Sequence, residues 1–298
     1  MRTPMKIAII GFGMMGQQIA QVFAQNGHDV SVTDENPEVL RTGLDSIETG
    51  PYGIRSLIAK GKMTNEQGAV VLHRIRATPS ISEACKDAGV IVEAVFEDLR
   101  LKQRIFETAE FSADPTALLA SNTSTLSIAK IAATLRHKDR ALGMHFFNPA
   151  QITKLVEIVR TEETSAEAVD LASKTLQSMG KAPILARDEP GFVANRLGLT
   201  LFVEASKLVE DRIAEVRDVD SAMKLGYNHP MGPFELADFV GLDTRLRNLE
   251  ALYESTGDVR WIPPKTLREL VNKGYLGDPA RKKGSRGGYY EFLGLTRP

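Results

Sequence analysis

The chain has 298 residues, of which 43% are hydrophobic and 25% charged, as is ordinary for a globular protein long enough to form two domains. Its 37 basic and 38 acidic residues leave a net charge of −1, which argues against nucleic-acid or anionic-membrane partners. No apolar run approaches the roughly 18 residues of a membrane span, and the only cysteine, Cys85, excludes an internal disulfide and a thiolate metal site; we expect a cytoplasmic protein.

The first predicted strand and helix enclose three glycines. Residues 6–10, KIAII, form an apolar, β-branched run that predicts a buried strand, and residues 17–25 have helical periodicity. The glycines between them have the spacing G-x-G-x-x-G, which permits a tight turn, close approach of a pyrophosphate to the backbone, and close packing of helix on strand. The expected dinucleotide contacts are Gly11, Gly13, Met14, Met15 and Gly16. The alternative is a glycine-rich turn in an ordinary α/β protein.

A carboxylate follows the second predicted strand. Residues 28–33 end at Asp34, which lies 18 residues beyond Gly16. An acidic side chain at this point can bind the ribose hydroxyls of a dinucleotide. Because it would repel a 2′-phosphate, Asp34 favours NAD over NADP.

Strands and helices alternate to about residue 188, which implies a largely parallel, doubly wound sheet with helices on both faces. Further strands are predicted at 90–95, 117–121, 140–147, 154–159 and 182–186. Helices are predicted at 38–48, 53–60, 65–73, 101–111, 127–135 and 165–179.

The pattern changes after Pro190. Long helical segments are predicted at 192–210, 218–225, 233–253 and 263–273. We therefore predict an α/β domain over residues 1–188 and a small all-helical domain over residues 189–298.

Reactive side chains follow three of the predicted strands, at the edge where open α/β sheets bind their ligands. They are Glu93 with Glu97, Asn122 with Ser124, and His145 with Asn148. Three further histidines, His28, His73 and His137, lie beside helices or turns and are expected at the surface.

Glu157 lies inside an otherwise apolar strand, where a carboxylate is costly to bury unless it is paired. The preceding strand carries His145, so we predict a pair in which Glu157 orients the imidazole and stabilises its charged form. The alternative is a solvated glutamate on an edge strand and a core histidine. A histidine base beside a dinucleotide suggests hydride transfer from an alcohol, without zinc.

Five motifs together resemble the L-3-hydroxyacyl-CoA dehydrogenase family, which includes short-chain 3-hydroxybutyryl-CoA dehydrogenases. They are SNTST at 121–125, HFFNP at 145–149, KLVEIV at 154–159, PGFVANR at 190–196 and HPMGPFELADFVGLD at 229–243. The resemblance covers residues 5–292 and implies a Rossmann-type NAD-binding domain, a helical domain that forms a homodimer interface, and a role in fatty acid metabolism.

The resemblance also implies catalytic roles. His145 would be the general base, Glu157 its partner, and Ser124 and Asn195 would donate hydrogen bonds around the substrate oxygen.

For the ligands, the resemblance implies that Glu97 and Lys102 line the nicotinamide half of NAD. Asn122 and Ser124 would lie beside the nicotinamide ribose, and Lys60 would reach the CoA phosphates.

Two segments depart from the family pattern. Residues 50–53 are turn-like, and Gly53 stands where some members have a CoA-contacting serine. The tail carries one extra residue, so either Lys282 or Lys283 could close over the cofactor.

The function implied is reversible, NAD-dependent oxidation of an L-3-hydroxyacyl-CoA, with no metal. Two alternatives remain: a dehydrogenase of a free hydroxy acid, of the gulonate or carnitine type, and a non-catalytic NAD-binding protein. Phe146, Phe147 and Lys60 favour the thioester.

Overall fold

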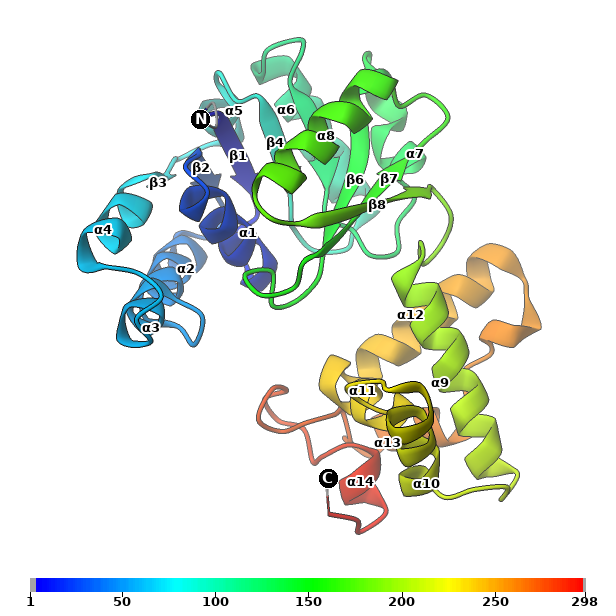
Figure 1. Ribbon diagram of the computed structural model, residues 1–298. Helices are drawn as coiled ribbons and strands as arrows, with labels where there is room; N and C mark the ends of the chain where they lie inside the picture. The colour runs from blue at the N-terminus through cyan, green and yellow to red at the C-terminus, as the bar shows by residue number, and fades with distance from the viewer. Residues whose placement is uncertain (1–3, 297–298) are drawn as a thin grey trace. The chain divides into compact units, whose positions relative to one another are not determined.

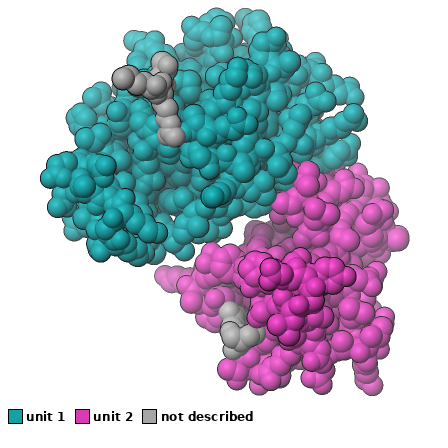
Figure 2. Space-filling view, in the orientation of Figure 1, with its two compact units in different colours: residues 1–189 teal, residues 190–298 magenta. Residues whose placement is uncertain are grey.

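The computed structural model describes residues 4–296, and the chain divides into two compact units, residues 1–189 and 190–298 (Figure 2). Each unit has its own buried apolar cluster. Within residues 4–296, no helix combines the length and the apolarity that crossing a bilayer requires.

The first unit is built on one eight-stranded sheet with the order β3-β2-β1-β4-β5-β6-β7-β8 (Figure 1). The strands are β1 (Lys6–Ile10), β2 (Asp29–Thr33), β3 (Ile75–Ala77), β4 (Val90–Glu93), β5 (Leu118–Ser121), β6 (Ala141–Phe146), β7 (Leu155–Arg160) and β8 (Ala182–Arg187). All neighbouring strands are parallel except β6 and β7, which are antiparallel. The predicted doubly wound, largely parallel sheet is confirmed.

Helices cover both faces of this sheet, with α1 and α8 on one face and α5, α6 and α7 on the other (Figure 1). Their bounds are α1 (Met14–Gln25), α2 (Pro37–Thr49), α3 (Ile54–Ala59), α4 (Asn65–His73), α5 (Ile81–Cys85), α6 (Leu99–Ser112), α7 (Ile128–Ile131) and α8 (Ala166–Ser178). Two 3₁₀ turns follow α7, at Ala132–Thr134 and Lys138–Arg140.

Side chains that cap the helices define where several of them begin. Asn36 accepts a hydrogen bond from the Glu38 amide at the start of α2, Thr64 forms a capping box with Gln67 at α4, and Asp98 caps α6. Such caps satisfy amides that have no partner within the helix. The Asp98 cap fixes where the chain turns from the end of β4 into α6.

The second unit is helical, as predicted. Its helices are α9 (Ala194–Glu210), α10 (Val216–Ser221), a π-helical turn (Ala222–Gly226), α11 (Pro233–Val240), α12 (Leu242–Thr256), a 3₁₀ turn (Val259–Trp261), α13 (Lys265–Asn272) and α14 (Tyr289–Phe292). The rings of Phe202, Phe234 and Tyr289 pack with centroids 4.7 to 6.1 Å apart and form the centre of its core.

Two expectations about local structure are wrong. The single helix predicted over 233–253 is two helices, because Gly241 adopts φ +107° and the Leu242 amide donates to the Leu276 carbonyl instead of continuing α11. His28 is buried, because its ring packs edge-on against Phe23 with centroids 5.7 Å apart and its Nδ1 accepts from the amide of Met5.

Candidate active site

The glycine turn between β1 and α1 leaves no room for side chains at two of its three glycines. Gly11 has φ +89°, and a Cβ there would lie 2.7 Å from Val95. A Cβ at Gly16 would overlap the carbonyl oxygen of Gly11, so the helix can approach the turn only with glycine at this position. A Cβ at Gly13 would meet nothing within 4 Å, which leaves this backbone open to a ligand.

The two methionines predicted to contact the dinucleotide, Met14 and Met15, are the first residues of α1. Met14 is 59% exposed, whereas Met15 packs partly against the apolar core. The helix therefore presents its first amides beside the open backbone, and a helix N-terminus favours a bound anion such as a pyrophosphate.

Asp34 is fixed beside the same turn. One carboxylate oxygen accepts from the Phe12 amide at 2.8 Å, and the other accepts from the Asn36 amide at 3.0 Å. A carboxylate oxygen can accept more than one hydrogen bond, so both remain able to receive ribose hydroxyls. The turn, the helix N-terminus and this carboxylate fit a dinucleotide of the NAD type.

The loop after β5 is held to both of its neighbouring strands. Asn122 Oδ1 accepts from the Phe146 amide at the end of β6, at 2.9 Å. On the other side, Glu97 Oε1 accepts from the hydroxyls of Thr123 and Thr125 and from the amides of Ser124 and Thr125. The structure thus brings Asn122, Ser124 and Glu97 together at the carboxyl edge of the sheet.

The carboxyl of Glu97 titrates below its ordinary range. Partial burial raises its pKa, but the charge of Lys102 and the hydrogen bonds from Thr123, Thr125 and Ser124 lower it further. Glu97 therefore carries its negative charge at neutral pH.

Lys102 lies beneath the carboxyl edge rather than on it, with a side chain that is 1% exposed. Its Nζ lies 2.7 Å from Glu93 Oε1 and 3.3 Å from Glu97 Oε2. Glu93 was not among the predicted cofactor-binding residues. The sequence did contain a signal for it: Glu93 is the last residue of an otherwise apolar strand, which indicates that its side chain is buried.

His145 and Glu157 face each other across the antiparallel pair β6–β7. His145 Nδ1 lies 2.7 Å from Glu157 Oε2, and the two residues are 6% and 0% exposed. β7 lies between β6 and β8, so Glu157 is not a solvated glutamate on an edge strand. The Phe147 ring packs on the imidazole with centroids 4.5 Å apart, which restricts its orientation.

The loop after His145 contacts the first helix. Gln18 on α1 donates to Asn148 Oδ1 at 3.0 Å and accepts from the Ala150 amide at 2.7 Å. These bonds hold the end of β6 beside the helix that begins at the glycine turn.

The residues expected to contact CoA lie at the third helix. Lys60 is exposed at the end of α3. Gly53 precedes α3, and a Cβ there would lie 2.7 Å from the Ile47 carbonyl and 2.8 Å from the Gly50 amide nitrogen. This position therefore has no room for a serine side chain.

The remaining candidates belong to the helical unit. Asn195 is in the first turn of α9 and is partly exposed. Lys282 Nζ forms an ion pair with Asp243 Oδ1 at 2.6 Å, whereas Lys283 is exposed.

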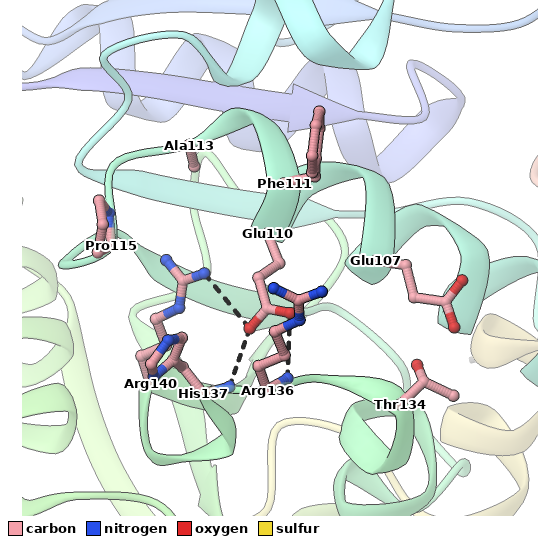
Figure 3. Close-up of a pocket in the computed structure, with 9 residues that line it drawn as sticks. All are labelled: Glu107, Glu110, Phe111, Ala113, Pro115, Thr134, Arg136, His137 and Arg140. Carbon is pink, nitrogen blue, oxygen red and sulfur yellow. Dashed lines mark hydrogen bonds and ion pairs between the residues drawn. The ribbon is translucent and has the colours of Figure 1, made fainter.

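A pocket occurs at the opposite edge of the sheet, where β5 and β6 begin (Figure 3). There, Glu110 accepts from the amides of Arg136 and His137 and lies 3.5 Å from the guanidinium of Arg140. These bonds satisfy the carboxylate within the fold, away from the candidate active site. Residues 4–296 contain no group of three or more histidine, cysteine or acidic side chains placed to hold a metal ion.

The fold and the site define the class: an NAD-dependent oxidoreductase with a Rossmann-type domain followed by a helical domain. Residues 6–189 match the model of the 3-hydroxyacyl-CoA dehydrogenase NAD binding domain, and residues 191–287 match that of the 3-hydroxyacyl-CoA dehydrogenase C-terminal domain. The chain belongs to the 3-hydroxyacyl-CoA dehydrogenase family.

Relatives match over nearly their whole lengths. A Deinococcus radiodurans protein named "Probable 3-hydroxybutyryl-CoA dehydrogenase" is 40% identical over 97% of this chain and 100% of its own. The 3-hydroxybutyryl-CoA dehydrogenase of Clostridioides difficile is 35% identical over 97% of this chain and 99% of its own. The crystal structure of (S)-3-hydroxybutyryl-CoA dehydrogenase PaaH1 from Ralstonia eutropha has a TM-score of 0.88 and 34% identity, over 96% of this chain and 99% of that one.

Proposed function

We propose that this protein reversibly oxidises short-chain L-3-hydroxyacyl-CoA thioesters, such as 3-hydroxybutyryl-CoA, to 3-ketoacyl-CoA with NAD. The observation that carries the proposal is the buried pair of His145 with Glu157, in the same unit as the dinucleotide turn; His145 lies on β6, which neighbours β5 and the loop of Ser124. The names of the relatives supply the acyl class.

His145 is the general base of the proposed reaction. Its Nδ1 is engaged by Glu157, so Nε2 takes the proton of the substrate 3-hydroxyl. Glu157 fixes the imidazole ring and stabilises the imidazolium that forms when the proton arrives. When bound, NAD would supply the acceptor for the hydride on C3, the carbon that bears this hydroxyl.

Ser124 and Asn195 are proposed to donate hydrogen bonds to the reacting oxygen. Hydrogen-bond donors held at the position where charge develops lower the barrier in the way an oxyanion hole does. The bonds from the amides of Ser124 and Thr125 to Glu97 fix the turn that presents the Ser124 hydroxyl.

The ligand contacts follow from the positions of the other candidates. Asp34 would bind the adenine ribose, and Asn122 and Glu97 would border the nicotinamide half. Lys60 would meet the CoA phosphates. Of the two tail lysines, Lys283 is proposed to approach the cofactor, because Lys282 is engaged by Asp243.

A two-fold homodimer in the cytoplasm is the proposed state of the protein. Several large apolar side chains of the helical unit are strongly exposed: Leu197 (67%), Ile213 (69%), Leu225 (88%) and Tyr227 (75%). A symmetric partner is the commonest way to cover such side chains.

The test is NADH oxidation with acetoacetyl-CoA, followed by absorbance and compared with free acetoacetate at equal concentration. We expect turnover with the thioester and little with the free acid. Turnover that is equal or faster with the free acid would favour the gulonate- or carnitine-type alternative. NADH binding without turnover of either would indicate a non-catalytic binding protein.

A further inference from the structure

Glu93 is a buried charge that the proposed chemistry does not use. It is the last residue of β4, and its side chain is 0% exposed, so it offers no surface to a ligand. Burying a carboxylate is costly, so its position calls for a physical reason.

Each oxygen of the Glu93 carboxylate is tied to a different neighbouring element. Oε1 accepts from Lys102 Nζ on α6 and from the amide of Val95, both at 2.7 Å. Oε2 accepts from the hydroxyl of Ser121, the last residue of β5, also at 2.7 Å. One buried carboxylate therefore links the ends of two parallel strands and the helix that follows the first.

Both links lead to the turn that carries Ser124. Lys102 extends to Glu97, which accepts the amides of Ser124 and Thr125. The Ser121 hydroxyl also accepts from the amide of Thr123, one residue before Ser124. The contacts form a closed loop, from Glu93 through Lys102 and Glu97 to the turn, and back through Ser121.

Stability alone does not explain this arrangement. A buried ion pair is often no more stable than well-packed apolar side chains of the same volume, whereas breaking one partner is costly. The carboxylates of Glu93 and Glu97 and the ammonium of Lys102 instead constrain the position of the turn that carries Ser124. Small displacements of a group near the reacting atoms can cost about 100-fold in rate.

We infer that Glu93 is a positioning residue: through Lys102 and Ser121 it holds Glu97 and the turn of Ser124 where the substrate oxygen and the nicotinamide half of the cofactor meet. The inference rests on the proposed function for the role of Ser124. It assigns Glu93 no contact with either ligand.

Three variants test it. Glu93→Gln removes the charge and keeps the size, Ser121→Ala cuts only the link to β5, and the double variant Glu93→Gln/Lys102→Met removes both buried charges. The matched control is Glu110→Gln, a partly buried carboxylate that also accepts backbone amides and faces a cation, but at the opposite edge of the sheet.

Amide hydrogen exchange of the enzyme without ligands is the first readout. In Glu93→Gln and Ser121→Ala, the amides of Ser124 and Thr125 should exchange at least about tenfold faster, while those of β1 stay protected. Turnover of NADH with acetoacetyl-CoA should fall about 10- to 100-fold. The control should match the wild type in both measurements.

The double variant separates positioning from stability. Removing both fully buried charges together should return the melting temperature close to the wild type, because neither Glu93 nor Lys102 is left as a buried charge without its partner. Exchange at Ser124 should stay fast and turnover low, because Glu97 has lost its cation. Recovery of turnover together with stability, or unchanged exchange at Ser124 in all three variants, would overturn the inference. If the wild type does not turn over acetoacetyl-CoA, the proposed function fails, and the exchange data still decide whether Glu93 holds the turn.

Discussion

Replacing Glu157 by glutamine tests the central pair of the proposed mechanism. The change removes a charge from a side chain that is 0% exposed and 2.7 Å from His145 Nδ1, while keeping its size. A hydrogen bond to a charged group is worth about 1.5–3 kcal/mol, and that stabilisation is needed only when the imidazole has taken the proton. At about 1.4 kcal/mol per tenfold, its loss alone corresponds to roughly 10- to 150-fold in rate.

A second effect adds to the first. The glutamine amide can present either its oxygen or its NH₂ group to Nδ1, and the NH₂ group would favour the tautomer that carries the proton on Nε2. That tautomer cannot accept the substrate proton, as in hydrolases whose buried aspartate is replaced by asparagine. The two effects together predict a fall in turnover of about 10²- to 10⁴-fold, within the range of acid–base contributions.

The assay is steady-state oxidation of 3-hydroxybutyryl-CoA with NAD, with NADH affinity measured by fluorescence titration. NADH affinity should change little, because the pair is proposed to act on the substrate hydroxyl and not to bind the dinucleotide. Glu163→Gln is the control, since Glu163 is an exposed glutamate in the turn that follows β7. Near-normal turnover in Glu157→Gln would refute the assigned role and leave Glu157 as a buried structural glutamate.

Four further outcomes are expected. The kcat/KM with NADPH should be about 100-fold lower than with NADH. Asp34 is fixed by two amides and repels a 2′-phosphate at a cost of about 3 kcal/mol. Comparable kcat/KM values for the two cofactors would contradict this. Gly16→Ala should abolish NADH binding in fluorescence titration, since its Cβ would overlap the Gly11 carbonyl; retained affinity would show that the turn can relax. Ser124→Ala and Asn195→Ala should each lower kcat by about 30- to 1,000-fold, equivalent to about 2–4 kcal/mol of barrier, while the circular dichroism spectrum stays unchanged. A change in NADH affinity alone would count against the proposed roles of these two residues. Burial raises the pKa of the Cys85 thiol to about 12, so a thiol reagent at pH 8 should label the native protein hardly at all and the denatured protein once per chain; rapid native labelling would be inconsistent with the packing.

The alternation of apolar strands and amphipathic helices was enough to predict most of the first unit. β1, β4 and β5 are short apolar runs with turn residues after them, and their parallel order follows from the helices between them. β3 was missed because its three residues, IRA, carry no periodic pattern. It forms because Val30 to Val32 of β2 offer it a free edge. A single glycine, Gly241, divided a helix that periodicity alone treated as continuous.

Those parts of the candidate site could be predicted in which a residue type is unusual for its position in the sequence. The parts that depend on contacts between distant segments could not. A glutamate in an apolar strand, following a strand that carries a histidine, was sufficient to pair His145 with Glu157. Lys102 was a different case, because a lysine on an amphipathic helix is almost always exposed. Its burial is explained by its tertiary partners, Glu93 at the end of β4 and Glu97 in the loop that follows.

Carboxylates organise backbone at both edges of the sheet, so organised backbone does not by itself mark a functional site. Asp34 and Glu97 accept main-chain amides at the carboxyl edge, and Glu110 does the same at the amino edge without any expected chemistry. The carboxyl edge differs because the residues fixed there lie with open backbone at Gly13, which can receive a ligand, and with an imidazole at His145 that is paired and can accept a proton. Rigid charges that hold reactive groups in place, with an opening for the ligand, are the arrangement that preorganised catalysis requires.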